Sequence, residues 1–253
     1  MGVASRHFVR DLCPKPCKDG FRPGRNFLSI FALAAMSATA LAADIKPAII
    51  YDLGGKFDKS FNESAFNGAE KFKTDTGIGY RDFEIQNDAQ REQALRKFAR
   101  DGNNPIVMAG FSWAAALEKV GAEFPDTDFA IIDMVVDLPN VRSVVYKEQE
   151  GSYLVGVMAA KKSTTGTVSF VGGMDIPLIR KFACGYAGGV KETNPQATVL
   201  QAMTGTTPDA WNDPVKGGEI AKSQIAQGSD VVYAAAGGTG IGVLQAAADE
   251  GKP

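Results

Sequence analysis

The most constraining feature of this sequence is a regular alternation of short apolar runs with amphipathic stretches, which begins at Ala43. The apolar runs have the length of strands, and the stretches between them have the period of helices. This alternation predicts βαβ units, in which parallel strands form a sheet with helices on both faces. The predicted strands are 47–53, 82–86, 105–110, 129–135, 141–146, 167–172, 198–202 and 230–236. The predicted helices are 62–74, 89–100, 114–123, 148–161, 178–192, 213–227 and 240–249, and the predicted N-caps are Ser60, Asp88, Ser112 and Asp213.

The alternation is interrupted at residues 161–166, where the sequence reads Lys-Lys-Ser-Thr-Thr-Gly. We therefore expect two lobes, an N-terminal α/β lobe over residues 43–163 and a C-terminal α/β lobe over residues 164–253. Few strands are predicted for the second lobe, and its last residues, 251–253, are typical of the approach to another strand. We expect this C-terminal lobe to be incomplete, as in a truncated sequence.

The first 42 residues have the layout of a secretory signal peptide. Arg22 and Arg25 precede an apolar stretch over residues 27–35, and Ala-Leu-Ala at 40–42 provides small residues for cleavage. This apolar stretch is shorter than the roughly 20 residues that a membrane-spanning helix requires. We therefore expect residues 1–42 to be removed and the remaining chain to be a periplasmic protein.

The charge of the remaining chain argues against nucleic acid as a partner. Residues 1–42 hold six of the 27 basic and two of the 29 acidic residues, which leaves 21 basic and 27 acidic residues and a net charge of −6. Nucleic-acid binding depends on basic residues that neutralise phosphates. An acidic exported protein without a basic cluster is therefore not expected to bind DNA or RNA.

Residues 43–253 contain no histidine, because the only one is His7, and their only cysteine is Cys184. This composition excludes Ser-His-Asp and Cys-His catalysis and any zinc site that uses histidine. We expect no catalytic residues, no metal ion and no cofactor.

Two aspartates lie close to the carboxyl ends of predicted strands of the first lobe. Ligands of open α/β sheets bind beyond the carboxyl ends of the strands, and Asp52 and Asp133 both stand at such ends. They could act as an acid–base pair, as in glycoside hydrolysis, or as hydrogen-bond acceptors. Because no activated nucleophile accompanies them, we favour the acceptor role. Their position alone leaves a turn or capping role equally open.

A glycine-rich stretch, Ala-Gly-Gly-Thr-Gly-Ile-Gly over residues 236–242, follows a strand and opens a helix. It is close to the G-x-G-x-x-G dinucleotide motif without matching it, and it lies late in the chain instead of after the first strand. Phosphate binding by the amides at the start of the helix is one interpretation. The favoured interpretation is a tight turn, at which Gly237 and Gly238 allow close approach of the backbone.

Aromatic residues lie at the predicted ligand edge of both lobes. Phe61 is at the start of a first-lobe helix and Tyr233 is near the end of a second-lobe strand. If both face one cleft, they could hold a flat ring by stacking, each worth roughly 1–3 kcal/mol. The alternatives are a hydrophobic staple for Phe61 and core packing for Tyr233. Phe111 and Trp113 are further candidates for the rim of the cleft.

Several stretches together resemble the basic membrane protein family, whose members are substrate-binding proteins of ABC importers and include purine nucleoside receptors. Residues 52–55 (Asp-Leu-Gly-Gly) followed by 58–62 (Asp-Lys-Ser-Phe-Asn) resemble the D-x-G-x and D-K-S-F-N signature of the family. Residues 149–154, 171–174 and 236–240 are similar to later family motifs in the same order.

This resemblance implies a type I periplasmic-binding-protein fold, with two Rossmann-like lobes and a ligand cleft between them. It implies that Phe61 and Tyr233 stack on a purine base, and that Asp52, Asn62 and Asp133 bind base or ribose by hydrogen bonds. It also implies that the backbone of Gly237 and Gly238 lines the cleft. The family continues beyond the point at which this sequence ends, with residues that complete the ribose site.

The sequence therefore predicts a monomeric binding protein, not an enzyme, that delivers a purine nucleoside or related base to an ABC permease in the membrane. Two alternatives remain open. One is a Rossmann-type enzyme that uses the glycines at 237–242 to bind a dinucleotide. The other is a ligand-sensing receptor protein of the same fold.

Overall fold

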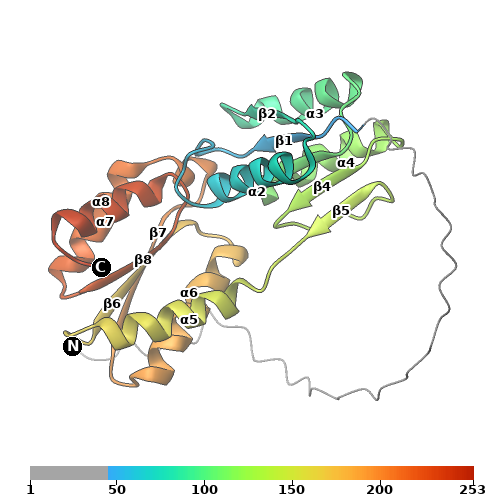
Figure 1. Cartoon of the computed structure of the whole chain (residues 1–253). Coiled ribbons are helices and arrows are strands. Elements are labelled where there is room, and N and C mark those ends of the chain that lie inside the picture. Colours follow the sequence, from blue (N-terminus) through green and yellow to red (C-terminus); the bar gives the residue numbers. More distant parts are fainter. Residues whose placement is uncertain (1–44) are drawn as a thin grey trace, which may run out of the picture.

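The computed structural model describes residues 45–253, which form two parallel sheets flanked by helices (Figure 1). The predicted signal peptide lies outside the described residues. Within residues 45–253, no helix is long and apolar enough to cross a membrane. The architecture confirms the predicted α/β fold with parallel sheets.

The first sheet has the strand order β2-β1-β3-β4-β5, and all its pairings are parallel. Its strands are β1 (Ala48–Tyr51), β2 (Arg81–Glu84), β3 (Ile106–Ala109), β4 (Phe129–Ile132) and β5 (Val141–Val144). Every residue of β1 is buried, as expected for an inner parallel strand covered on both faces. In contrast, β2 lies at one edge and is largely exposed.

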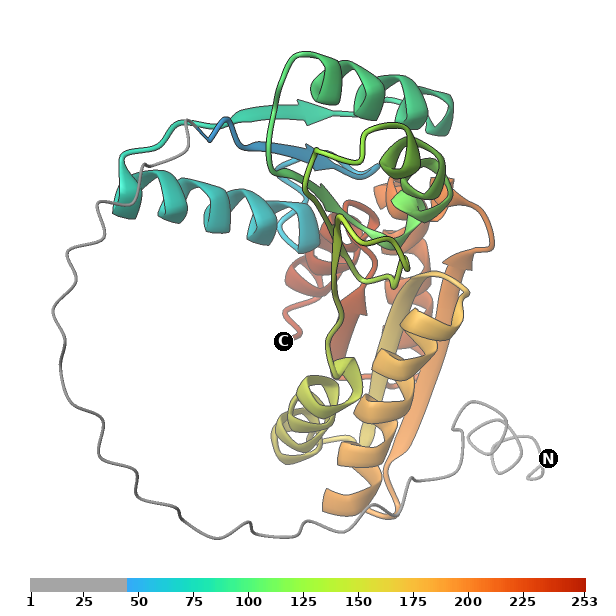
Figure 2. The ribbon, with the colours of Figure 1, turned by 90° about the vertical axis from the view of Figure 1, so that its right-hand side faces the viewer.

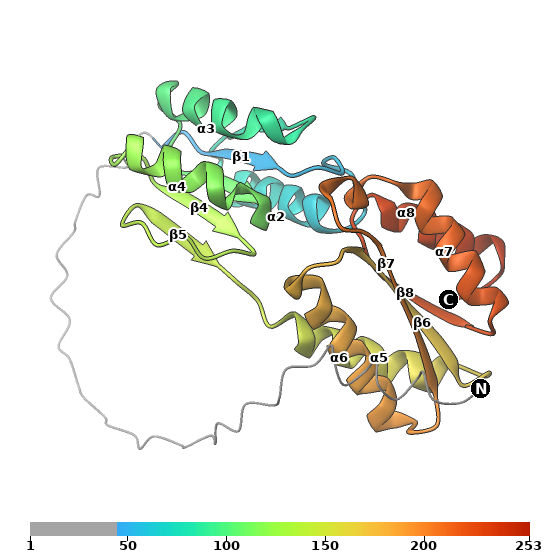
Figure 3. The ribbon, with the colours of Figure 1, turned by 180° about the vertical axis from the view of Figure 1, so that it is seen from behind.

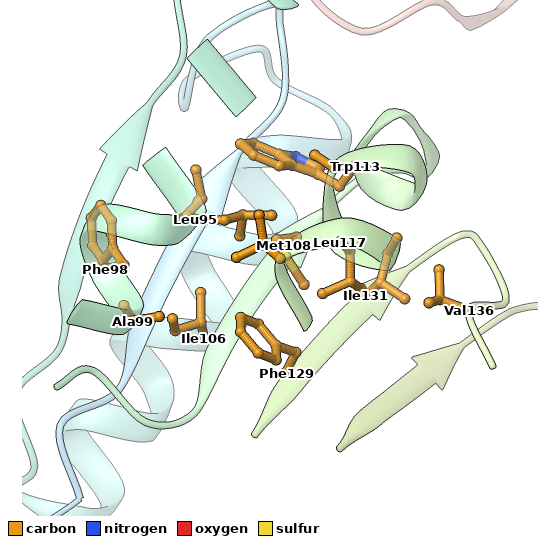
Figure 4. Packing of buried hydrophobic residues seen from close by; sticks show 14 of the residues in the cluster. Leu95, Phe98, Ala99, Ile106, Met108, Trp113, Leu117, Phe129, Ile131 and Val136 are labelled. Atoms are coloured by element: carbon orange, nitrogen blue, oxygen red, sulfur yellow. The ribbon is translucent and has the colours of Figure 1, made fainter. Parts of the chain in front are cut away.

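Helices cover both faces of this sheet. Helix α2 (Phe61–Thr76) lies on one face, and α3 (Arg91–Arg100) and α4 (Ala114–Glu123) lie side by side on the other (Figures 1 and 3). The main hydrophobic cluster fills the space between the sheet and α3 and α4 (Figure 4). It includes Leu95, Phe98, Trp113, Leu117 and Phe129, all of them buried. Burial of each such side chain stabilises the fold by about 1.5–3 kcal/mol.

The second sheet has the order β7-β6-β8, again parallel. Its elements are α5 (Glu148–Lys162), β6 (Thr167–Met174), α6 (Pro177–Thr193), β7 (Thr198–Gly205), the short 3-10 helix η3 (Pro208–Trp211), α7 (Pro214–Ala226), β8 (Val231–Ala235) and α8 (Thr239–Asp249). Val168 and Phe170 of β6 pack in the cluster with α5 and α6. Val171 lies in a separate cluster with α7 and α8, as the two-residue period of a strand requires.

Helix α5 packs against α6 of the second sheet (Figures 1 and 2). The two backbones approach at Gly156, Gly185 and Gly189, where a β-carbon would overlap main-chain atoms of the opposite helix. The predicted division at residue 163 assigned 148–161 to the first lobe, but these contacts group α5 with the second sheet. We therefore place the boundary between the two packing units after β5, before Glu148.

Of the predicted helix caps, Asp213 is confirmed, Ser60 lies at the predicted position without a capping hydrogen bond, and Asp88 and Ser112 are wrong. The Asp213 carboxylate accepts a hydrogen bond from the backbone N–H of Lys216, as an N-cap does. Ser60 precedes α2 but its side chain forms no capping hydrogen bond. Asp88 and Ser112 lie within short 3-10 turns that precede α3 and α4. These turns extend the helices toward their amino ends, so the expected capping position falls inside the turn.

Candidate functional site

A cavity of about 860 Å³ lies between the two packing units, within the size range of ligand sites in proteins. It is lined by segments that follow β1, β3, β4 and β5 in the first sheet, and by parts of α5, α6, η3 and the end of β8. Six of the seven residues predicted for the ligand site line it: Asp52, Phe61, Asn62, Asp133, Tyr233 and Gly237. The seventh, Gly238, does not line the cavity. It follows Gly237 directly and precedes α8.

Asp52 and Asn62 join the end of β1 to the start of α2. The Asn62 amide accepts a hydrogen bond from the Asp52 backbone N–H (3.1 Å) and donates to the Asp52 carbonyl oxygen (3.2 Å). The Asp52 carboxylate accepts from the Leu53 N–H (2.7 Å) and forms a buried ion pair with Arg91 (2.6 Å). Both side chains therefore shape this wall of the cavity through contacts within the protein.

Asp58, which was not predicted for the site, caps α2 in place of Ser60. Its carboxylate accepts hydrogen bonds from the backbone N–H groups of Ser60 (2.8 Å), Asn62 (3.1 Å) and Glu63 (3.1 Å). Burial raises the pKa of this carboxyl above its usual value, and the three N–H donors oppose that effect. Because the cap fixes the first turn of α2, it also holds Phe61 at the cavity.

Asp133 follows β4 in a left-handed backbone conformation (φ 71°), which is uncommon for a residue other than glycine. Its backbone N–H donates to the Val144 carbonyl oxygen (2.8 Å), which extends the β4–β5 ladder by one residue. The pKa of the Asp133 carboxyl is raised to about 6, mainly by burial and in part by the charge of Glu148, while the charge of Lys181 opposes the rise. Strained residues of this kind are concentrated at functional sites.

Both rings of the predicted pair, Phe61 and Tyr233, line the cavity, but the Tyr233 ring is also packed on other aromatic rings. The Tyr233 ring packs on Phe170 (centroids 5.5 Å apart) and on Tyr186 (5.2 Å), and its hydroxyl is 3.2 Å from the Ser152 hydroxyl. Much of this ring is therefore engaged in the core of the second unit. Trp211 of η3 also lines the cavity, and sequence analysis missed it.

Trp211 is held between the two units. Its ring lies against Gly173, where a β-carbon would overlap it, and it meets Phe111 of the first unit edge-on with centroids 6.4 Å apart. The one available signal was an aromatic residue in the polar loop 207–213, between a strand and a helix.

Phe111 lines the cavity as expected for a rim residue. Trp113 does not, because it is fully buried in the first core with the Arg91 guanidinium 4.8 Å from its ring centroid.

The glycine-rich turn makes a close backbone contact with the first unit. Gly237 has φ 54°, a left-handed conformation that glycine adopts at no cost. A β-carbon at Gly238 would lie 3.2 Å from the Gly54 carbonyl oxygen and 3.1 Å from that of Trp211. These contacts are those of a tight turn with close backbone approach. In the described part of the chain, no cluster of three metal-ligating side chains occurs.

A family model described as "ABC transporter substrate-binding protein PnrA-like" (Bmp) matches residues 46–253. The chain is 36% identical over 207 residues to the "CD4+ T-cell-stimulating antigen" of Listeria monocytogenes, an alignment that covers 79% of this chain and 57% of that protein. It is 32% identical over 219 residues to the "ABC transporter nucleoside-binding protein BmpA" of Lactococcus lactis, covering 85% of this chain and 61% of that protein. The chain thus spans about three-fifths of the length of these relatives.

A similar fold is found in a solved structure titled as an ABC transporter system solute-binding protein from Aeropyrum pernix. The TM-score is 0.74 at 32% sequence identity, and the match covers 82% of this chain and 59% of that one. The match confirms the expected similarity to solute-binding proteins of the periplasmic type.

Proposed function

Because the chain belongs to the Bmp family of PnrA-like ABC transporter substrate-binding proteins, we propose that it binds a purine nucleoside in the cavity between its two packing units and delivers it to a membrane permease. The family consists of substrate-binding proteins of transporters, not of enzymes. A relative named as nucleoside-binding supports the choice of ligand class. The observation that carries the proposal is that aromatic rings and carboxylates from both units line one cavity.

The proposed binding mode uses the rings for the face of the base and the carboxylates for its edges. Phe61 supplies a ring from the first unit, at the start of α2. From the second unit, the contacts favour Trp211 as the ring opposite it, because Tyr233 already packs on two other rings. Tyr233 then forms part of the cavity wall. Stacking on each ring contributes roughly 1–3 kcal/mol to binding.

Calorimetric titration with guanosine, inosine, adenosine, guanine and NAD tests this proposal. We expect at least one nucleoside to bind, and Phe61→Ala to weaken binding by about 5- to 150-fold through loss of one stacking partner. Phe57→Ala is the matched control, because Phe57 lies in the same loop, is largely exposed and is absent from the cavity lining. Binding of NAD without any nucleoside would contradict the proposal.

A second pair of variants tests which ring of the second unit contacts the base. We expect Trp211→Ala to weaken nucleoside binding more than Tyr233→Leu does. The opposite order would assign the stacking role to Tyr233 instead. Thermal unfolding of each variant, followed by circular dichroism, separates loss of a ligand contact from loss of the fold.

The export of the protein is a further part of the proposal. We propose that cleavage after Ala42 releases a monomer into the periplasm. Mass spectrometry of the exported protein should give an N-terminus at Ala43, and size-exclusion chromatography with light scattering should give the mass of a single chain. A protein retained in the cytoplasm with residues 1–42 intact would contradict this part.

A further inference from the structure

The cavity is lined by four carboxylates, and three of them have hydrogen-bond or ion-pair partners within the protein. Asp52 is paired with Arg91, and Asp58 accepts three backbone N–H groups. Glu148 is 3.3 Å from the Lys181 ammonium, although its own side chain is only 4% exposed. Among residues 45–253, no hydrogen bond or ion pair reaches the side chain of Asp133. Of these four carboxylates, Asp133 is therefore the one with neither oxygen bonded within the described residues, so both of its oxygens can accept from a ligand.

Asp133 and Glu148 belong to different packing units and line the same cavity. Asp133 follows β4 of the first sheet, and Glu148 is the first residue of α5, which packs on the second. The short segment after β5 connects the two units at this point (Figure 1). Two acidic side chains from different packing units therefore line one cavity near the junction.

The charged groups that act on Asp133 are Glu148 from α5 and Lys181 from α6. Lys147, the neighbour of Glu148, is paired with Glu150 at 3.0 Å and is largely exposed. A like charge near a buried carboxylate favours its neutral form, and a nearby cation favours its charged form. Glu148 thus raises the pKa of Asp133 and Lys181 lowers it, and both effects are smaller than that of burial.

We propose that Glu148 is a positioning residue for Asp133 across the junction between the two units, so that ligand binding at the Asp133 carboxylate is coupled to a proton. A ligand edge with N–H or O–H donors binds the ionised carboxylate. At lower pH the carboxyl takes a proton and loses this acceptor role. The ligand part of the inference rests on the proposed function, while the electrostatic part does not.

The electrostatic part is tested without ligand, by NMR titration of the full chain labelled with 13C at the aspartate carboxyls. The signal that is missing in Asp133→Asn identifies Asp133. We expect a titration midpoint of about 6 in the wild-type chain. We expect Glu148→Gln to lower this midpoint and Lys181→Gln to raise it. Glu150→Gln is the control and should leave it unchanged, because Glu150 is exposed and is absent from the cavity lining.

Opposite shifts in the two variants are the signature of the inference, since a general loss of structure would not produce them. A midpoint near 4 in the wild-type chain, or shifts in the same direction, would overturn it. If Glu148→Gln does not fold, Lys181→Gln decides the matter, because Lys181 is half-exposed.

The ligand part is tested by calorimetry with guanosine at pH 7.5 and pH 5.5. If only the ionised form of Asp133 binds, the affinity for guanosine should fall about fourfold at the lower pH. The decrease should be smaller in Glu148→Gln, because its lower midpoint leaves more of the Asp133 carboxyl ionised at pH 5.5. Equal affinity at both pH values, together with a measured midpoint near 6, would overturn the coupling. Absence of nucleoside binding at either pH would instead refute the proposed function and leave the NMR result as the test of the electrostatic part.

Discussion

Asp52 and Asp133 are the same residue type at equivalent places, each directly after a strand of the first sheet and each lining the cavity. Their surroundings in the structure differ. Asp52 is buried in an ion pair with Arg91, whose guanidinium also lies over the Trp113 ring. Asp133 has no such partner among residues 45–253 and sits in a strained backbone conformation.

This difference separates a charge that belongs to the fold from one that is available to a ligand. Arg91 and the Leu53 N–H use the Asp52 Oδ1 atom, so the side chain is anchored whether or not a ligand is present. The Asp133 charge is costly in the free protein, because burial opposes it. Position at a strand end is therefore not enough to identify a ligand contact.

The largest expected effect is the loss of the cation that compensates Asp52. Arg91→Met should lower the free energy of unfolding by about 3–5 kcal/mol, because it leaves a buried carboxylate without a counter-charge. Urea denaturation measures this. Arg96→Met is the matched control: Arg96 lies on the same helix in more exposed ion pairs, and its loss should cause only a small decrease because exposed pairs contribute little. A similar small loss for Arg91→Met would remove the distinction between the two aspartates.

A smaller loss is expected from Asp52→Asn. The amide oxygen can still accept from the Leu53 N–H and from Arg91, and Arg91 retains Asp88 at 2.7 Å. What is lost is the charge-assisted part of the hydrogen bonds, about 1–2 kcal/mol in the free energy of unfolding. Urea denaturation should show a larger loss in the free energy of unfolding for Arg91→Met than for Asp52→Asn. The reverse order would mean that Asp52, not its partner, carries the stabilisation.

The smallest effect has the opposite sign. Asp133→Asn should raise the free energy of unfolding at pH 7.5, because it removes a charge whose burial is unfavourable. The gain should be less than the roughly 3 kcal/mol that the full pKa shift would give, because the side chain is only partly buried and water screens its charge. The pKa of Asp133 is raised in the folded chain, so the wild-type protein is most stable with respect to this group at low pH. It loses that stability as the pH rises through about 6. The advantage of the variant should therefore grow between pH 4 and pH 6 and then stay constant.

Thermal unfolding at pH 4.5, 6 and 7.5 measures this dependence, with Asp52→Asn as the comparison. An Asp133→Asn variant that is destabilised at every pH would show that Asp133, like Asp52, has a structural partner.

The strands and helices could be predicted because their signals are local. Apolar runs such as residues 47–53 and the helical period of 114–123 depend only on neighbouring residues. The helix caps were less predictable, since Asp58 reaches the first turn of α2 across a short loop and Ser60 does not.

The cavity itself depends on packing that the sequence does not display. Trp211 lines it because β7 pairs with β6 and brings η3 against Gly173. Before that pairing is known, residues 208–211 have the composition of an ordinary polar turn. The assignment of α5 to the second unit likewise depends on glycine contacts with α6, between segments that are separate in the sequence.

The central claim is that one ligand contacts both packing units in a single cavity. Hydrogen-exchange mass spectrometry of the chain with and without saturating guanosine tests it most directly, since ligand contact slows exchange of the amides that it covers or orders. We predict added protection in the first unit around residues 52–65 and 132–134, and in the second unit around residues 208–212 and 233–238. Protection confined to one unit, or no protection at any of these segments under saturating ligand, would contradict the account.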